Sequence, residues 1–321
     1  MGNKNNIIEV NAIDKEVTIG IFSPSEPVIN KRIEKFNAGI NLLHENGFKT
    51  KLSKNVFAHT NYTAGDVKTR INDIHDLLDD DNVDILLSSW GGKGCSQLLK
   101  YLDYEKIKIA KKPILGFSDP CVLTNYISAT TGLVTFYGPN VVGKLDQTSH
   151  LDFTILKPNL PKDYNILGNI DCVNSKIIFG GKATGKLFGG NLSTFVLGAV
   201  SSDIPRSFFD DGIFFWEELN MPIQIIDQYM TALKNMGIID NLKGMVIGHF
   251  LCEEEKEWKK TEPFEAINNM FKKYNFPIIY SPTFGHIKLE NPIFPIGALC
   301  TLDTSKKSLT LESKITRIQN G

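Results

Sequence analysis

A serine stands where an apolar segment gives way to a helical pattern, in KKPILGFSDPCVLTNYISATTG, residues 111–132. Residues 113–115 are apolar like a buried strand, a glycine permits a tight turn, and apolar residues recur at helical spacing after Pro120. Ser118 would therefore project its hydroxyl beside the free N–H groups that begin the helix, where a developing oxyanion is stabilised. That placement suits a nucleophile in acyl transfer. The alternative is that Ser118 or Asp119 caps the helix, the commoner use of these residues.

A serine nucleophile needs a base that accepts its proton, and histidine is the usual one. Two of the six histidines are candidates by position: His249 ends the apolar segment GMVIGHF, and His286 lies in a glycine-flanked loop. The residues alone leave this choice open, and either imidazole could be structural. The other four lie in amphipathic helices or polar loops, where surface or packing roles are expected: His44, His59, His75 and His150.

The third member would be a carboxylate that orients the imidazole. Glu217 follows directly on the apolar strand pattern GIFFW, so its side chain can be held, partly desolvated, at the edge of a sheet. Glu218 should point the opposite way, towards solvent, because side chains alternate along a strand. The alternative for both is an ordinary solvated strand end. The charged run 253–260 is expected to be a solvated loop.

Alternating strand and helix patterns in the first half of the chain would position these groups. Their order predicts a doubly wound parallel sheet with helices on both faces. The expected strands are 17–22, 48–52, 83–90 and 113–115, and the expected helices are 29–46, 64–80, 95–102 and the one after Pro120. Two loops, WGGKG (90–94) and GFSD (116–119), would then meet at the carboxyl edge of the sheet, where binding crevices form. WGGKG does not have the spacing of a common phosphate-binding loop.

A polar, proline-containing segment separates this half from the second. We expect an N-terminal domain over residues 1–150, a linker over 151–168 and a C-terminal domain over 169–321. The second half orders its strands and helices differently and predicts a mixed α/β domain. Its expected elements are glycine-rich strands from Lys176, a helix from near Asn191, strand 211–216, helix 223–236, a strand from Gly244, a helix to about Tyr274, and strands near 278–279, 297–302 and 308–311.

Composition and charge limit the kinds of partner. Lysine and arginine total 35 against 36 aspartates and glutamates, so no basic excess favours nucleic acid or an anionic membrane surface. The N-terminus has no apolar core of signal-peptide length, and no later segment has the apolar length of a membrane span, so the cytoplasm is expected. The five dispersed cysteines form no CxxC pair, and we expect reduced thiols without a structural metal: Cys95, Cys121, Cys172, Cys252 and Cys300.

Five blocks of the chain carry a specific resemblance. In their order and spacing they are similar to the LD-carboxypeptidase family of serine peptidases, which includes peptidases that confer self-immunity to microcin C. The blocks are GGKGCSQLLKYLDY, PILGFSDPCVLTNYISATTGLVTFYGP, GKLFGGNLSTF, IFFWEELNMPIQIIDQYMTALKNMGIIDNLKGMVIGHF and PTFGHIKLENPIFPIGALCTLD. The early VTIGIFSPSEPV also fits, so the resemblance covers nearly the whole chain.

The resemblance implies a fold and a site. It implies a flavodoxin-like N-terminal domain, a C-terminal domain of swivelling type, a cleft between them and a homodimer. Acyl transfer to water through a serine needs no metal or organic cofactor, so we expect none. The implied nucleophile, acid and base are Ser118, Glu217 and His286, which leaves His249 a structural role. The implied oxyanion hole consists of the backbone amides of Asp119 and of Gly91 or Gly92.

The substrate class stays open between two kinds of peptide. One is an L,D-linked murein tetrapeptide, and the other is a peptidyl or aminoacyl adenylate of the microcin type. The chain departs from the family in having Pro120 and Cys121 after the aspartate. It departs from the murein LD-carboxypeptidases in having Trp90, where they tend to carry an arginine, before the glycine pair. Trp90 or Trp216 could form an aromatic wall for an adenine, although both could equally pack, and Asn191 is a further candidate for substrate contact. A non-catalytic binding protein or sensor of the same fold is the alternative from another functional class.

Overall fold

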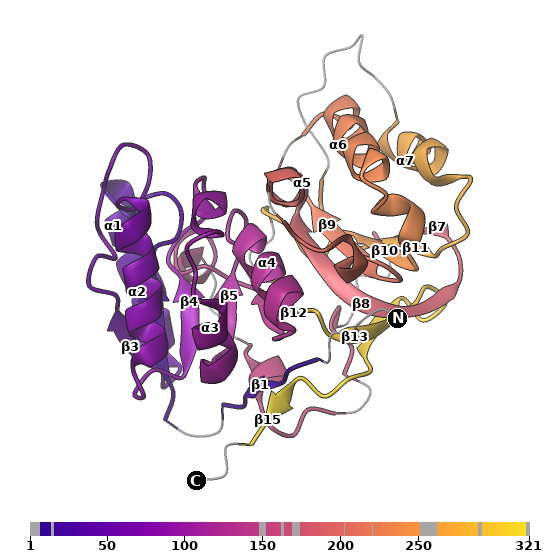
Figure 1. Cartoon of the computed structure of the whole chain (residues 1–321). Coiled ribbons are helices and arrows are strands. Elements are labelled where there is room, and N and C mark those ends of the chain that lie inside the picture. Colours follow the sequence, from indigo (N-terminus) through magenta and orange to yellow (C-terminus); the bar gives the residue numbers. More distant parts are fainter. Residues whose placement is uncertain are drawn as a thin grey trace.

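The computed structural model describes residues 7–13, 16–147, 152–161, 164–168, 174–201, 203–219, 221–250, 262–287 and 291–318. These residues form two main sheets, which lie in separate halves of the molecule, and one short pair of strands (Figure 1). The charged run 253–260, expected to be a solvated loop, lies outside the described residues. In the described ranges, no helix is both long and apolar enough to cross a membrane.

The first sheet has six strands, in the order β12-β6-β5-β4-β2-β3. They are β2 (Thr18–Phe22), β3 (Lys49–Leu52), β4 (Ile85–Ser88), β5 (Ile114–Gly116), β6 (Thr135–Tyr137) and β12 (Phe294–Ile296). All neighbours are parallel except β12, which runs antiparallel to β6. Strands β2 to β6, numbered along the chain, thus stand in the order 2-1-3-4-5. This order confirms the flavodoxin-like, doubly wound sheet.

Four α-helices accompany this sheet: α1 (Lys31–Glu45), α2 (Val67–Asp79), α3 (Tyr104–Ala110) and α4 (Cys121–Thr131). α2 begins after Asp66, whose carboxylate accepts a hydrogen bond from Thr69 N at 2.7 Å, and α4 ends at Gly132 with a φ of +77°. The predicted helices 29–46 and 64–80 are confirmed to within three residues. The sequence patterns do not predict α3 or β6, which are too short to show a clear period.

The second sheet has seven strands, in the order β14-β13-β8-β9-β10-β11-β7. They are β7 (Lys176–Phe179), β8 (Lys182–Asn191), β9 (Ile213–Glu217), β10 (Gly244–Ile247), β11 (Ile278–Tyr280), β13 (Leu299–Asp303) and β14 (Ser308–Leu311). The central strands β8 to β11 are parallel and the outer ones antiparallel. Three α-helices belong to this half: α5 (Leu192–Ser201), α6 (Ile223–Asn235) and α7 (Pro263–Phe271). The mixed sheet and these helices confirm the prediction of a mixed α/β second half. Short 3₁₀ helices are η1 (Cys95–Leu98), η2 (Leu145–Gln147), η3 (Thr154–Leu156), η4 (Arg206–Phe208) and η5 (Ile239–Asn241).

Segments from the end of the chain also join the two halves. β12 adds an edge strand to the first sheet, and β1 (Val10–Asn11) pairs with β15 (Thr316–Arg317). The described part of the predicted linker packs through buried apolar side chains, which are Phe153, Ile155, Leu156, Ile166 and Leu167. Ile166 N also donates a hydrogen bond to Leu309 O at 2.8 Å. The halves are therefore connected by packing and backbone hydrogen bonds as well as by the covalent chain.

Candidate active site

Ser118 lies just beyond the carboxyl end of β5, where the backbone turns into α4. Its φ is +67°, a left-handed conformation that is uncommon for a residue with a side chain and that clusters at functional sites. Gly116 is needed at this turn, because a Cβ there would lie 2.4 Å from the Cβ of Pro120. In the described structure, no side chain caps α4, so the capping alternative for Ser118 and Asp119 is wrong. Ser118 is a partly exposed residue on a strained elbow.

A buried asparagine fixes the backbone of this elbow. Asn140 accepts a hydrogen bond from Phe117 N and donates one to Phe117 O, both at 2.9 Å. Its side-chain oxygen also accepts a hydrogen bond from the hydroxyl of Ser88, at the end of β4. The residue before Ser118 is therefore held on both backbone polar groups, which limits the directions in which the serine can point.

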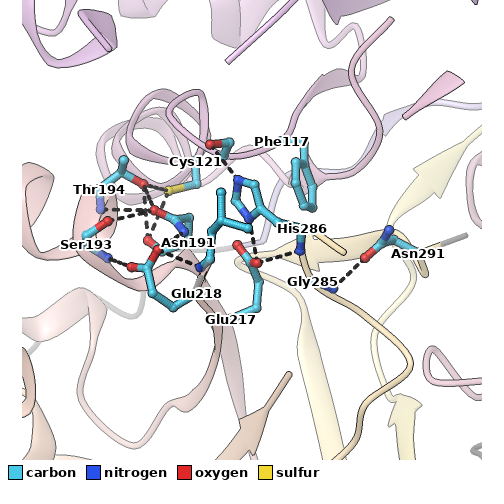
Figure 2. A network of polar contacts seen from close by, with 12 residues as sticks. Phe117, Cys121, Asn191, Ser193, Thr194, Glu217, Glu218, Gly285, His286 and Asn291 are labelled. Carbon is cyan, nitrogen blue, oxygen red and sulfur yellow. Dashed lines mark hydrogen bonds and ion pairs between the residues drawn. The ribbon is translucent and has the colours of Figure 1, made fainter. Parts of the chain in front are cut away.

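The imidazole of His286 lies between Ser118 and Glu217. His286 is in the loop between β11 and β12, and its Nε2 is 3.1 Å from Ser118 Oγ. Its Nδ1 is 2.7 Å from Glu217 Oε2, which also accepts the backbone N–H of His286 at 2.9 Å (Figure 2). When Nδ1 carries the proton and donates it to Glu217, the lone pair of Nε2 faces the serine hydroxyl. His249 takes part in backbone pairing near this loop, donating its N–H to Phe284 O at 2.8 Å.

The carboxylate of Glu217, the last residue of β9, is fully buried. The hydroxyl of Tyr137 donates a hydrogen bond to its Oε1 at 2.9 Å. Burial raises the pKa of Glu217, but the charge and hydrogen bonds of His286 together with the Tyr137 hydrogen bond outweigh it and hold this pKa below its ordinary value. Burial, with the charge of Glu217, raises the pKa of Tyr137 well above its ordinary value. Glu217 is therefore ionised at neutral pH, and Tyr137 remains a donor.

Glu218 points away from Glu217, but it does not face solvent. The sequence-based expectation of a solvated Glu218 is wrong, because this side chain is 4% exposed. Its carboxylate accepts hydrogen bonds from Asn191 Nδ2 at 2.9 Å and from Ser193 N at 2.8 Å (Figure 2). Asn191 is buried and its Oδ1 also accepts the N–H of Thr194. These contacts secure the first turn of α5, so they give Asn191 a structural explanation.

The glycine loop lies directly against the serine. A Cβ on Gly91 would be 2.9 Å from Ser118 Cβ, and a Cβ on Gly92, whose φ is +99°, would be 2.4 Å from the Glu26 carboxyl carbon. Among the described residues, the backbone N–H groups of Gly91, Gly92 and Asp119 have no protein acceptor. These amides are therefore free to donate to an oxygen bound beside Ser118.

The carboxylate of Asp119 ties neighbouring loops to the elbow. Its Oδ2 accepts hydrogen bonds from Ser25 Oγ at 2.6 Å and from Cys95 N, just after the glycine loop, at 2.9 Å. Burial raises the pKa of Asp119 above its ordinary value, and these two hydrogen bonds and the charge of Arg70 oppose that shift. Asp119 thus positions the loop through its side chain, while its backbone N–H has no protein acceptor among the described residues.

Gly91→Ala is expected to lower the reactivity of the Ser118 hydroxyl, because the new methyl group would collide with Ser118 Cβ. The collision would shift the serine or the loop and cost about 1–3 kcal/mol of stability, as overpacking generally does. Gly180→Ala is a useful control for general glycine effects, since a Cβ there would meet only Thr304 Oγ1, at an ordinary contact distance of 3.9 Å. The comparison needs the rate at which a fluorophosphonate labels Ser118 and the melting temperature of each variant. A wild-type labelling rate in Gly91→Ala would contradict the close approach of loop and serine.

Comparison with known proteins decides the family. A model of the LD-carboxypeptidase N-terminal domain matches residues 19–138, and a model of the LD-carboxypeptidase C-terminal domain matches residues 184–302. The chain belongs to the LD-carboxypeptidase family. It is 26% identical to the Microcin C7 self-immunity protein MccF of Escherichia coli over 92% of each chain. It is 27% identical to the probable murein peptide carboxypeptidase of Bacillus subtilis, over 95% of this chain and 94% of that one.

Solved structures agree with this membership. An MccF-like protein from Bacillus anthracis is 26% identical, with a TM-score of 0.78 over 95% of this chain and 99% of that one. Wild-type MccF without ligand has a TM-score of 0.83 over 97% of this chain and 100% of that one, at 24% identity. The two-sheet fold is thus the fold of known LD-carboxypeptidase relatives.

The two tryptophans of this LD-carboxypeptidase family member differ in their access to a ligand. Trp216 is fully buried, and its indole nitrogen lies 3.3 Å from Met245 Sδ, so its role is packing. Trp90 is partly exposed next to the glycine loop, and the guanidinium of Arg32 lies 5.0 Å from its ring centre. Only Trp90 of this pair is placed where a bound molecule could reach it.

Three residues at the site have no role in the sequence analysis: Tyr137, Asn140 and Lys144. Tyr137 is the last residue of β6, at the carboxyl edge of the sheet and within the segment TFYGP. That position at a strand end is the sequence signal that could have indicated Tyr137 as a site residue. Asn140 and Lys144 lie in irregular chain after β6, where no local pattern marks them. In the described ranges, no group of three histidine, cysteine or acidic side chains could hold a metal ion.

Proposed function

We propose that this LD-carboxypeptidase family member is a serine peptidase in which Ser118, Glu217 and His286 hydrolyse an amide bond. The observation that carries the proposal is the continuous contact from Ser118 Oγ to His286 Nε2 at 3.1 Å and from His286 Nδ1 to Glu217 Oε2 at 2.7 Å. The strained backbone of Ser118 and the burial of Glu217 support it.

The reaction follows from the direction of each hydrogen bond. His286 Nε2 accepts the proton of Ser118 Oγ as the oxygen forms a bond to the carbonyl carbon of the substrate. Glu217 stabilises the imidazolium that results. The amide bond then breaks, and the leaving nitrogen takes the proton from His286. Water, activated by the same imidazole, releases the acyl group from Ser118.

The oxyanion of the tetrahedral intermediate would be bound by backbone amides. Asp119 N–H and the N–H of Gly91 or Gly92 flank Ser118 and have no protein acceptor among the described residues. Donors of this kind are each worth about 3–4 kcal/mol of transition-state stabilisation. The positive end of α4, which begins at Cys121, points to the same place.

For the substrate we propose a small aminoacyl or peptidyl nucleotide. MccF has been solved in complex with aspartyl sulfamoyl adenosine and with glutamyl sulfamoyl guanosine. Trp90, partly exposed beside the glycine loop, gives this chain an aromatic side chain against which a base could pack. Relatives named murein peptide carboxypeptidases make a murein peptide the competing substrate.

A side-by-side assay tests both parts of the proposal. The purified protein would be given aspartyl sulfamoyl adenosine or an L,D-linked murein tetrapeptide, and the released products would be quantified by chromatography. We expect the higher kcat/KM for the nucleoside compound. Preference for the tetrapeptide would overturn the substrate class and leave the peptidase assignment in place. Binding without hydrolysis of either would favour a non-catalytic binding protein.

A further inference from the structure

Lys144 links the first half of the chain to the loop that carries His286. The lysine is 3% exposed and lies between β6 and η2. Its Nζ donates hydrogen bonds to two consecutive carbonyl oxygens of that loop, Gly285 O at 2.8 Å and His286 O at 3.1 Å. The backbone of His286 is therefore held by a charged donor from outside its own sheet.

The same ammonium packs against the elbow of Ser118. Lys144 Nζ lies 4.5 Å from the ring centre of Phe117, the residue before the serine. The Phe117 ring in turn lies 4.9 Å from the imidazole of His286 (Figure 2). A cation over an aromatic face is attracted to it. Lys144, Phe117 and His286 thus form one packed unit beside the row of Ser118, His286 and Glu217.

The His286 loop needs such a support because it is irregular and approaches the serine from the other half of the chain. Gly285 has a φ of +134° and its N–H donates to Asn291 Oδ1 at 2.7 Å. Asn291 secures this loop from within it, and Glu217 secures it from the second sheet. The contact between His286 Nε2 and Ser118 Oγ, by contrast, depends on how the loop lies against the first half.

We propose that Lys144 is a positioning residue, which holds the His286 loop at hydrogen-bonding distance from Ser118. The inference rests on the proposed function, since it concerns the base of that reaction. A misplacement of about 1 Å between reacting groups can lower a rate roughly 100-fold, so a single anchor of this kind has a measurable effect.

The charge of this anchor changes in an accessible pH range. Burial lowers the pKa of Lys144 to about 8, although the charge of Glu217 opposes the shift. The charge of Glu217 acts on Nζ, and His286, whose backbone carbonyl Nζ contacts, carries the imidazole that contacts Glu217. Above that pH the hydrogen bonds to the two carbonyls lose their charge assistance and the attraction to the Phe117 ring is lost. The reactivity of Ser118 should therefore fall as the pH rises through about 8.

This fall should not reflect unfolding. Between about pH 8 and the ordinary lysine value of 10.5, the unfolded chain binds more protons at this position than the folded chain does. The contribution of Lys144 to the free energy of unfolding therefore increases with pH in that window. Loss of reactivity without loss of thermal stability is the signature of the positioning role.

The test follows the labelling of Ser118 by a fluorophosphonate between pH 6 and 10. The serine oxygen forms a bond to phosphorus, fluoride leaves, and His286 takes the proton, so the rate reports the base without any assumption about substrate. We expect Lys144→Met to label roughly 10- to 100-fold more slowly at pH 7. Lys144→Arg, whose charge persists throughout this range, should lack the fall near pH 8.

Lys112 supplies a matched control. It is also buried, and its Nζ also donates to two backbone carbonyls, Leu77 O at 3.2 Å and Asp80 O at 2.6 Å. It precedes β5, at the opposite end of that strand from Ser118. Lys112→Met should lose stability comparably and keep the wild-type pH profile.

The outcomes separate this inference from the proposed function. No labelling of the wild type at any pH would overturn the proposed function and this inference with it. Wild-type labelling that is constant from pH 7 to 10 would overturn the role of Lys144 alone, as would an equal slowing in the Lys112→Met control. If Lys144→Met does not fold, the profiles of the wild type and Lys144→Arg decide the question.

Discussion

Ser118→Ala is expected to abolish amide hydrolysis while leaving the fold and ligand binding intact. The substitution removes only Oγ and keeps the Cβ, so the strained backbone with its φ of +67° is unchanged. Loss of the nucleophile in a site of this kind lowers kcat roughly 10⁴- to 10⁶-fold, and the remaining rate comes from oxyanion stabilisation and binding. The measurements are kcat with the preferred substrate and the Kd of aspartyl sulfamoyl adenosine by calorimetry.

Ser96→Ala is the control for this variant. Ser96 is an exposed serine of η1, close in sequence to the glycine loop, and its substitution should leave kcat near the wild-type value. Undiminished hydrolysis by Ser118→Ala would remove the serine from the mechanism. Equal loss in both variants would point to a general effect on the glycine loop.

Glu217→Gln should lower kcat by up to about 10⁴-fold, as expected when the orienting carboxylate of a triad becomes an amide. Glu217 accepts three hydrogen bonds, from His286 N, from His286 Nδ1 and from Tyr137 Oη. A glutamine would place an NH₂ group against one of these donors, so either Tyr137 or His286 loses its partner. If the imidazole changes tautomer, Nε2 carries the proton and cannot act as the base. The measurement is kcat against pH, with melting temperature for comparison.

Glu218→Gln is a closely matched control, since Glu218 is the adjacent carboxylate and is also buried and hydrogen-bonded. It accepts hydrogen bonds from Asn191, Ser193 and Leu219 rather than from the base. We expect a lower melting temperature with kcat within a few-fold of the wild type. Similar losses of kcat in the two variants would mean that both act through the end of β9, and the orienting role of Glu217 would then be wrong.

The long periodic elements could be predicted from the sequence, and the short ones could not. Helix α2 shows four apolar residues at helical spacing and an aspartate cap, and it lies within the predicted range. Strand β12 has only three residues and joins a sheet whose other strands lie more than 150 residues earlier. No local pattern encodes such a pairing, because it depends on the second half folding back against β6. The division of the chain at residue 150 stays a prediction.

In the site, the sequence predicts the direction in which a side chain points but not what surrounds it. Alternation along β9 predicts that Glu217 and Glu218 point opposite ways, and they do. Alternation does not predict what lies against Glu218. In the structure, the first turn of α5 contacts the Glu218 carboxylate and buries it. In the same way, the position of Trp216 at the end of an apolar strand left packing and binding open until its full burial favoured packing.

From residue chemistry and pattern alone, we predict a parallel sheet with Ser118 at the end of one of its strands. The same reasoning predicts a carboxylate at the end of a second strand and leaves two histidines as candidates for the base. The resemblance to the family then implied His286, and the tertiary structure places that imidazole, rather than that of His249, between Ser118 Oγ and Glu217 Oε2. The supports from Asn140, Tyr137 and Lys144 came only from the folded chain. The physical reason is that their effects arise from buried contacts between segments that meet only in the folded chain, and those of Tyr137 and Lys144 cross the two halves. Burial strengthens each of these hydrogen bonds, and sequence spacing carries no information about such contacts.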